Sequence, residues 1–405
     1  MTEKRIATLI ISITSLLIWS LLATNNIIGG KIQTILSILS LIPFVYSSFR
    51  LLTDYKLESS YFKFIFSLFL CYELIIVIRG WSFSYNDIKT FAQSGYVFWP
   101  FIIPLFVFFD KRITSFGLFF KWIYYSGLFA LFLTLIFPSL LFRRLTAETF
   151  IGLLVPCGFL LLNATYLSNR KINISFFLIF ISIISLTYLA RRSGLISLFG
   201  FVISGYFLNI IYKSKSKLFR YFPLLIIIGV FILFSQYFEN SREALFNKMI
   251  SRISEDTRST LFQMFFYDLR DNMLFGKGML GTYYFPVGGG SDLDEVFFAE
   301  ETYRTLVENG YLQLVLTGGV MHIILFLLVL VPAALKGIFL SSNQFTAACG
   351  VVILLRLLDM VFYGLPTISL TYIFVWICVG ICYKPSIRRM TNDEIRSEFR
   401  KINLL

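Results

Sequence analysis

The stretch that decides the fold class is residues 309–335, NGYLQLVLTGGVMHIILFLLVLVPAAL, which contains no Lys, Arg, Asp or Glu. A helix needs about 20 mostly apolar residues to cross the hydrocarbon of a bilayer. The rest of the chain has the same character, since 57% of the 405 residues are hydrophobic and 15% are charged. Its mean hydropathy of +0.77 is too high for a water-soluble fold of this length. We therefore expect lipid to be the solvent for most of the chain.

Eleven other segments are apolar over a comparable length, which predicts an all-α polytopic membrane protein with about 12 transmembrane helices. Strands are not expected in lipid, because an open sheet leaves backbone groups unpaired and these solid Phe, Leu and Ile runs lack alternation. The first run is expected to be retained, because no small-residue cleavage site closes it. The predicted spans are 6–23, 32–49, 61–78, 95–109, 115–137, 150–167, 173–190, 194–212, 221–238, 309–335, 345–362 and 366–383.

Lys and Arg in the short loops predict the orientation, because they accumulate on the cytoplasmic side. With the N-terminus inside, most loop cations and both termini are cytoplasmic, and the net charge of +13 reflects topology and anionic headgroups rather than nucleic acid. The expected organisation is helices 1–9 in residues 1–238, an outer segment in 239–308, helices 10–12 in 309–383, and a cytoplasmic tail in 384–405. Arginines on the less expected outer side are Arg79, Arg143, Arg144, Arg191 and Arg192.

The outer segment 239–308 is the one substantial hydrophilic part of the chain. A linker of this length would be rich in Gly and Ser or in Pro, whereas this one carries apolar residues at helical spacing. We expect two or three amphipathic helices there, lying over the membrane domain. The apolar residues are Leu261, Phe262, Met264, Phe265, Phe266 and Leu269, and the arginines are Arg242, Arg252, Arg258, Arg270 and Arg304.

Several kinds of chemistry are not supported by the residues. His322 is the single histidine, so zinc-protease motifs, a Ser-His-Asp triad with another histidine and multi-histidine metal sites cannot be assembled. There is no Gly-Lys-Ser/Thr phosphate loop, and the five cysteines all lie within apolar runs, where helix packing explains them. We expect neither a metal nor a cofactor. Two roles stay open for His322, a proton carrier or a neutral hydrogen-bonding residue.

Charges inside the spans form the next group, because a charge at a helix centre costs about 2.5 to 3.5 kcal/mol. Arg356 and Asp359 lie three residues apart and share a helix face. They form either an internal ion pair or part of a polar cavity that opens outward. Glu73 has no partner in its own span, so a distant arginine or a water-filled cavity is expected beside it.

Three further segments carry chemistry. Arg191-Arg192-Ser193-Gly194 places two guanidinium groups at a helical turn, which suits a diphosphate, although snorkelling to headgroups explains it too. The run 272–281, NMLFGKGMLG, permits close backbone approach to a ligand or is simply a turn. Residues 301–313, ETYRTLVENGYLQ, bring a polar edge directly into a membrane helix, which is a credible rim for an active site.

These three segments, in this order around one large outer loop, resemble the O-antigen polymerase and O-antigen ligase superfamily. The matching features are an Arg-Ser-Gly turn at 192–194, an arginine followed by an apolar helix and a Gly-x-Gly turn from 258 to 278, and a polar dipeptide before Tyr-Leu and Gly-Gly-Val from 308 to 320. The resemblance covers roughly 190–320. One departure is informative, because ligases of this superfamily carry His-Asn where this chain has Glu308-Asn309. That difference favours polymerisation over ligation.

The resemblance implies a GT-C-like, metal-independent membrane glycosyltransferase. It would act on undecaprenyl-diphosphate-linked oligosaccharides at the outer face of a bacterial plasma membrane, among membrane lipids, with a chain-length regulator and a flippase as further candidate partners. Without a metal, preorganised cations must meet the charge that grows on the leaving diphosphate. The candidate diphosphate binders are Arg191, Arg192, Arg258, Arg270 and Arg304, and the candidate catalytic residues are Glu308 and, second, Glu301, which would orient or deprotonate the acceptor hydroxyl.

Other classes of function stay open. A ligase would transfer the chain to lipid A core. A polysaccharide flippase or other transporter would account for Glu73, Arg356 and Asp359, but would usually show related halves with comparable broken helices. A non-catalytic membrane partner in envelope assembly is a third alternative.

Overall fold

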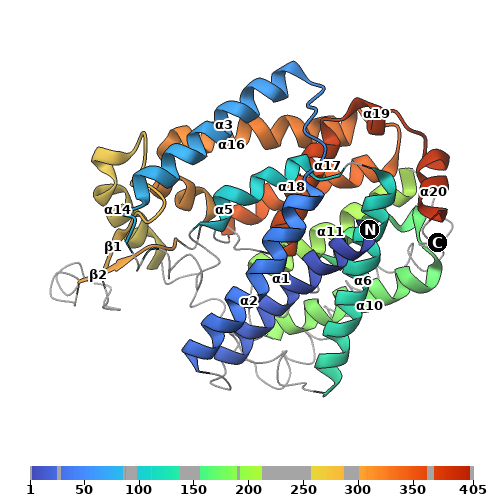
Figure 1. Cartoon of the computed structure of the whole chain (residues 1–405), viewed down its shortest axis with the longest axis horizontal. Coiled ribbons are helices and arrows are strands. Elements are labelled where there is room, and N and C mark those ends of the chain that lie inside the picture. Colours follow the sequence, from blue (N-terminus) through green and yellow to red (C-terminus); the bar gives the residue numbers. More distant parts are fainter. Residues whose placement is uncertain are drawn as a thin grey trace.

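The computed structural model describes residues 2–24, 29–84, 87, 98–110, 112–136, 156–188, 192–211, 257–286, 301–307, 309–362 and 369–401. Nearly all of these residues lie in helices, and one small sheet lies at an end of the bundle (Figure 1). The elements are α1 (Thr2–Thr24), α2 (Gly30–Leu51), α3 (Ser60–Gly80), α5 (Trp99–Ile102), η1 (Ile103–Phe108), α6 (Ile113–Ile136), α9 (Cys157–Leu162), η2 (Ala164–Tyr166), α10 (Asn169–Tyr188), α11 (Arg192–Ile211), α14 (Thr257–Asp268), η3 (Arg270–Asn272), β1 (Tyr283–Pro286), β2 (Glu301–Arg304), α16 (Gly310–Phe339), α17 (Gln344–Phe362), α18 (Leu370–Cys382), α19 (Pro385–Arg388) and α20 (Asn392–Arg400).

The mostly helical structure and its long apolar helices agree with the prediction of an all-α membrane protein. In the described part of the chain, five helices are long and apolar enough to cross a membrane. Three shorter apolar helices lie at Trp99–Phe108, Leu198–Ile210 and Leu370–Cys382. The predicted span 221–238 lies outside the described residues, so the number of twelve spans and the GT-C-like arrangement stay predictions. The five long helices are Lys31–Leu51, Ser60–Gly80, Ile113–Leu133, Gly310–Phe339 and Gln344–Val361.

Two predicted spans are not single regular helices in the structure. Span 95–109 consists, where described, of the short α5 and the 3₁₀ helix η1, which has Pro104 in its first turn. Proline lacks a backbone N–H, so a regular α-helix is harder to continue through it. The described part of span 150–167 is likewise divided between α9 and η2.

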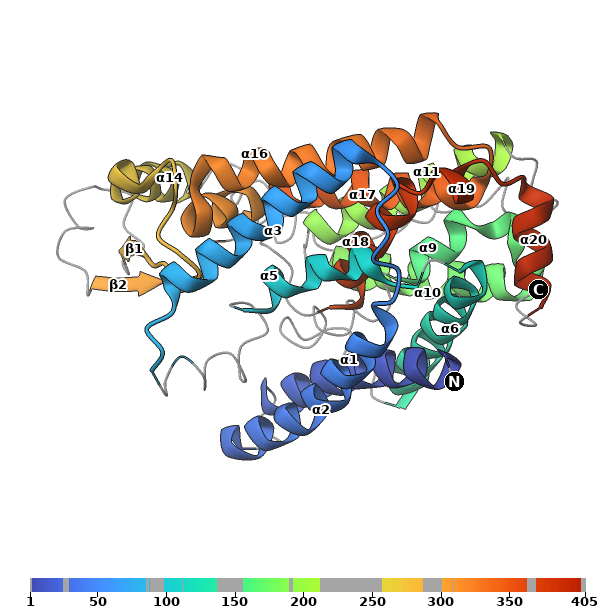
Figure 2. The same ribbon diagram turned by 45° about the horizontal axis from the view of Figure 1, so that its top comes forward.

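The core is built around α18, which packs against η1, α16 and α17 and lies in the middle of the bundle (Figure 2). Trp376 on α18 is fully buried and lies against the rings of Phe69 and Phe326. The outer faces of the bundle are also apolar, since Phe49 is 70% and Phe64 68% exposed. A face of this kind is what lipid accepts and water does not.

The described part of the outer segment lies at one end of α3 and α16 (Figure 1). The Phe-rich stretch forms α14 as its spacing predicts. The expectation of two or three helices stays a prediction, because 239–256 and 287–300 lie outside the described residues. The described part also contains an unexpected antiparallel pair of β1 and β2, in which Tyr283 lies opposite Arg304. Tyr283 packs edge-on against Phe265 of α14, and strand-favouring aromatic residues of β1 thereby cover an apolar helix face.

Candidate functional site

Helix α16 is broken at Gly318-Gly319. Gly319 has φ 67 and ψ −168, a backbone conformation that interrupts the helix and that side-chain-bearing residues rarely adopt. A break of this kind leaves carbonyl groups before it and N–H groups after it without partners inside the helix. In a membrane these groups must be satisfied by protein, because no water is available in the hydrocarbon.

The Gly-rich loop 273–281 supplies the missing partners. Lys277 N and Gly278 N donate to the carbonyl oxygens of Leu316 and Thr317 at 2.7 and 2.8 Å. On the other side of the break, Val320 N and Met321 N donate to the carbonyl oxygens of Met273 and Leu274 at 2.9 and 3.3 Å. The loop therefore replaces the hydrogen bonds that α16 loses, and the second and third sequence segments form one unit.

The glycines of the loop are required by this close approach. Gly276 has φ +67, and a Cβ there would lie 2.5 Å from Gly318 N. Gly278 has φ +88, and a Cβ would lie 2.8 Å from Gly80 N. In Gly319 the same atom would lie 2.2 Å from the carbonyl oxygen of Leu274. The run 272–281 is thus a backbone docking element in the structure.

The end of α3 closes over this unit. Arg79 Nη1 donates to the carbonyl oxygen of Phe275 at 2.8 Å, and its Nη2 donates to that of Gly276 at 2.6 Å. Met279 N donates to Ile76 O at 3.1 Å, and the hydroxyl of Tyr72 donates to Gly318 O at 2.6 Å. The sequence marked Arg79 as an arginine on the less expected side, but gave no sign of this partner.

The polar edge that leads into α16 is held on both sides of residue 308. Gln313 is buried, its Oε1 accepts from Val307 N at 2.7 Å, and its Nε2 donates to Thr305 O at 3.0 Å. Asn309 caps the helix by accepting from Tyr311 N and Leu312 N, and its Nδ2 donates to Val361 O at 2.7 Å. The segment is therefore fixed to α16 and to the end of α17.

Below the break, Glu73 of α3 meets His322 of α16. The Oε1 atom of Glu73 lies 3.0 Å from His322 Nε2, and His322 Nδ1 lies 3.4 Å from Thr317 Oγ1. Glu73 and His322 are only 4% and 2% exposed. The expectation of an arginine or a water-filled cavity beside Glu73 is wrong, because the histidine of α16 fills that place.

The predicted site residues are only partly described. Glu308 and Arg191 lie outside the described residues. For Arg192, Arg258 and Glu301 the structure gives the backbone alone, at the start of α11, in α14 and at the start of β2. Their arrangement around one diphosphate site stays a prediction. Arg270 and Arg304 are exposed.

Both members of the predicted intramembrane pair, Arg356 and Asp359, lie within the described residues. Arg356 and Asp359 form an ion pair on α17, as one of the two interpretations expected.

Lys277 is a charged residue that the predicted site omitted. Its Nζ lies 2.7 Å from Asp268 Oδ2 of α14 and 3.1 Å from Thr282 O. The loop is thereby tied to α14 as well as to α16. Within the described ranges, no group of three His, Cys, Asp or Glu side chains is placed to hold a metal ion.

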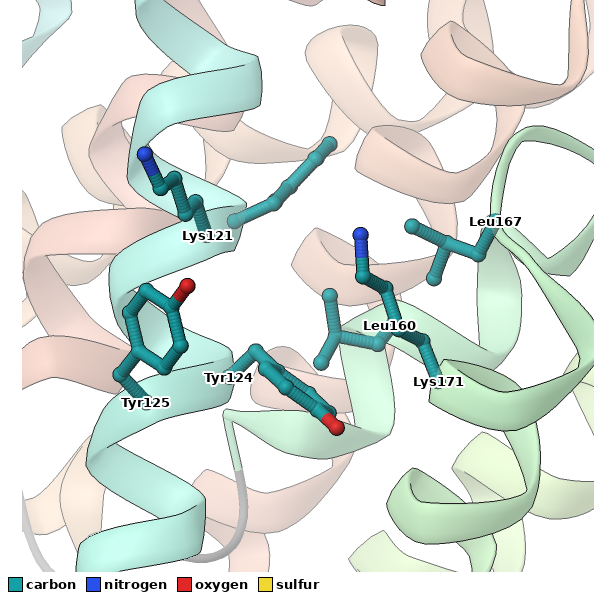
Figure 3. Close-up of a pocket in the computed structure, with 7 residues that line it drawn as sticks. Lys121, Tyr124, Tyr125, Leu160, Leu167 and Lys171 are labelled. Atoms are coloured by element: carbon teal, nitrogen blue, oxygen red, sulfur yellow. The ribbon is translucent and has the colours of Figure 1, made fainter. Parts of the chain in front are cut away.

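A small pocket lies elsewhere, between α6 and the α9–α10 region (Figure 3). Lys121, Tyr125 and Lys171 surround it, and Lys121 also forms a 2.8 Å ion pair with Glu3 of α1. Helices α6 and α10 lie at the end of the bundle away from α14 in both views (Figures 1 and 2). The pocket is therefore separate from the broken helix.

One comparison with known proteins covers the part of the chain that contains the Gly-rich loop and the break in α16. Residues 177–327 match the family model described as O-antigen ligase. The matched stretch starts within α10, includes α14, the Gly-rich loop and β2, and ends in α16 just after the break. The long apolar helices and this match together indicate an integral membrane protein. This partial match supports the resemblance to the O-antigen polymerase and ligase superfamily that the three sequence segments predicted. No curated protein and no solved structure matches the chain.

Proposed function

We propose that this protein is a surface-polysaccharide polymerase. It joins oligosaccharide repeat units carried on undecaprenyl diphosphate, at the outer face of the bacterial plasma membrane. The observation that carries the proposal is the family match over 177–327, which covers the outer segment together with its docking helix. Glu308, in the place where ligases of the superfamily carry histidine, favours polymerisation.

The proposed reaction needs no metal. A hydroxyl of the acceptor sugar attacks the anomeric carbon of the donor chain, the bond to the diphosphate breaks, and the polyprenyl diphosphate leaves. Negative charge grows on this leaving group, and fixed guanidinium groups can stabilise it. We assign that role to Arg191, Arg192, Arg258 and Arg270, with Arg304 as an additional candidate.

Glu308 is the proposed general base, with Glu301 as the second candidate. Support comes from its two neighbours, since Val307 is bonded to the Gln313 side chain and Asn309 caps α16. These two anchored neighbours belong to a rigid element at the N-terminus of α16. A catalytic group needs that rigidity, because small displacements of reacting groups cost rate.

The test is the polysaccharide profile of a strain that lacks the gene, separated on a gel by chain length. A polymerase predicts loss of long chains with single repeat units retained and still attached. Reintroduction of the intact gene should restore the long chains. Long chains of normal distribution in the deletion strain would contradict the proposal.

Two other functions have a specific observation in their favour. The family description favours a ligase, in which case the deletion strain makes long chains that are not attached to lipid A core. The broken α16 with a buried carboxylate beside it favours a flippase or transporter, because such proteins often use broken helices. In that case lipid-linked units accumulate on the cytoplasmic side. The same experiment separates all three.

The orientation is part of the proposal, with both termini cytoplasmic and the reaction outside. A cysteine placed within 285–295 should react with an impermeant thiol reagent added to intact cells. Labelling only after the cytoplasm is opened would contradict this orientation. A chain-length regulator and a flippase are the proposed protein partners.

A further inference from the structure

The Glu73–His322 pair has a defined pattern of donors and acceptors. Thr317 Oγ1 has one hydrogen, and the carbonyl oxygens of Gln313 at 3.0 Å and Leu314 at 3.3 Å are both nearer acceptors for it than His322 Nδ1. Toward His322 Nδ1, at 3.4 Å, the same oxygen is therefore the acceptor, and the hydrogen of that contact sits on Nδ1. A neutral imidazole protonated at Nδ1 has a bare Nε2, which can only accept.

With a neutral ring, the remaining contact requires a hydrogen on the carboxyl group. Nε2 lies 3.0 Å from Glu73 Oε1, a hydrogen-bond distance, so Oε1 must donate if Nε2 accepts. The second oxygen, Oε2, is buried and has no hydrogen-bond partner among the described residues. The carbonyl oxygen of a neutral acid tolerates this far better than an oxygen that shares a full negative charge.

We infer that Glu73 and His322 form a proton-binding site within the membrane domain, in which Glu73 carries the proton and hydrogen-bonds to His322 Nε2. The pair is then electrically neutral. Two arrangements with an ionised Glu73 fit less well. A cationic ring would separate two charges in an apolar interior and would leave the charged Oε2 buried without a hydrogen-bond partner. A neutral ring with its hydrogen on Nε2 is the other arrangement. It would leave a net charge in an apolar interior and would set the lone pairs of His322 Nδ1 and Thr317 Oγ1 against each other.

The charged groups around the pair do not remove the need for this proton. Arg79 is engaged with the carbonyl groups of the loop, Lys277 with Asp268, and Arg356 with Asp359. Two hydroxyls, of Tyr72 on α3 and Tyr372 on α18, lie within electrostatic reach of Glu73. The other near neighbours of the imidazole are the apolar rings of Phe69 and Phe101.

The proton has a structural consequence for the site. Glu73 joins α3 to the second half of α16, whereas Tyr72, one residue earlier, bonds the carbonyl of Gly318 at the break. The two contacts hold α3 against both sides of the break. Loss of the proton places an uncompensated charge between α3 and α16, beside the break. We therefore expect the docking of loop 273–281 to weaken when the proton leaves.

The single histidine makes a direct test practical. Protein labelled with ¹⁵N-histidine, purified without a histidine tag and reconstituted in bilayers, contains one labelled imidazole. Its nitrogen NMR shifts are expected to show a neutral ring protonated at Nδ1 and not at Nε2, near neutral pH. Protonation at Nε2, in a neutral or a cationic ring, overturns the inference.

Infrared spectroscopy tests the carboxyl group independently. The wild-type protein should show the C=O stretch of a protonated carboxylic acid, which Glu73→Gln removes and the surface variant Glu3→Gln retains. Absence of a Glu73-dependent acid band overturns the inference. The NMR measurement on the wild-type protein remains decisive if Glu73→Gln does not fold. Neither measurement depends on polysaccharide synthesis.

Discussion

Arg79 Nη2 donates a 2.6 Å hydrogen bond to the carbonyl oxygen of Gly276, although the two residues are 197 positions apart in the chain. A second bond from Nη1 reaches Phe275 O at 2.8 Å. The end of α3 therefore holds the loop whose backbone supplies the hydrogen-bond partners that α16 lacks at its break.

Arg79→Ala should weaken the docking of loop 273–281. A hydrogen bond to a charged group is worth about 1.5–3 kcal/mol, and because Arg79 is exposed we expect a total loss near the low end, about 2 kcal/mol. Hydrogen exchange of the reconstituted protein should show faster exchange at the amides of Lys277 and Gly278. Arg389→Ala, at an exposed position after α19, is the control, and equal exchange in the two variants would contradict the role of Arg79.

Gly278→Ala should destabilise the whole site. The residue has φ +88 and its Cβ would meet Gly80 N at 2.8 Å, so the variant must distort the backbone. Residues held in such regions cost about 1–3 kcal/mol, and the clash adds to that. Thermal unfolding in detergent measures the loss. Gly29→Ala is the matched control, because nothing lies within 4 Å of a Cβ at that position.

Gln313→Leu should lower activity more than it lowers the amount of folded protein. The variant leaves the buried N–H of Val307 without its 2.7 Å acceptor, a loss of about 1–3 kcal/mol. The segment beside Glu308 would then lose its anchor. Polymer formed per unit of protein should fall, with Gln263→Leu, an exposed position on α14, unchanged. An unaltered specific activity in Gln313→Leu would rule out this anchoring role.

Arg192→Ala and Arg258→Ala should each leave the protein in the membrane and remove long-chain polysaccharide. Removal of one group that stabilises charge in a transition state commonly costs about 10²–10³ in rate. Single repeat units should still be made. Arg50→Ala, at an exposed position in the last turn of α2, is the control. Normal long chains in both variants would show that the diphosphate site is wrongly assigned.

Asp110 should make the protein sensitive to acid. Burial raises the pKa of its carboxyl group, but hydrogen bonds from Arg112 and Ser115 outweigh burial and hold the pKa below the ordinary value of 3.8. A carboxyl whose pKa is lower in the folded state stabilises the fold above its unfolded pKa and loses that contribution as pH falls through the folded value. The free energy of unfolding of the wild type should therefore decrease as the pH falls below about 3.9, the pKa of an Asp side chain in an unfolded chain.

Asp110→Asn is the variant that tests this acid sensitivity. It should be less stable than the wild type at pH 7, and the difference should shrink as the pH is lowered. A difference that stays constant from pH 7 to the acid range would contradict the assignment. Asp393→Asn, whose side chain is 90% exposed, is the control.

Much of the local structure was predictable from the sequence because its causes are local. The apolar spacing of Phe262, Phe265 and Leu269 predicted a helix, and α14 spans Thr257–Asp268 with Leu269 directly after it. The Gly-x-Gly run was interpreted as a simple turn or as a loop that approaches a ligand, whereas in the structure its backbone approaches α16 and the end of α3. Nothing in the sequence indicated that β1 and β2 would pair.

The sequence by itself determined the solvent and the class of fold. Long apolar runs must lie in lipid, and a backbone in lipid must satisfy its polar groups within each helix, so composition and run length were sufficient. Only the tertiary structure decided which polar groups meet. The carboxyl group of Glu73 reaches His322 across 249 residues, and Lys277 repairs a helix break at Gly318-Gly319. These partners depend on which helices pack against one another, and the spacing of residues along the chain does not determine that packing.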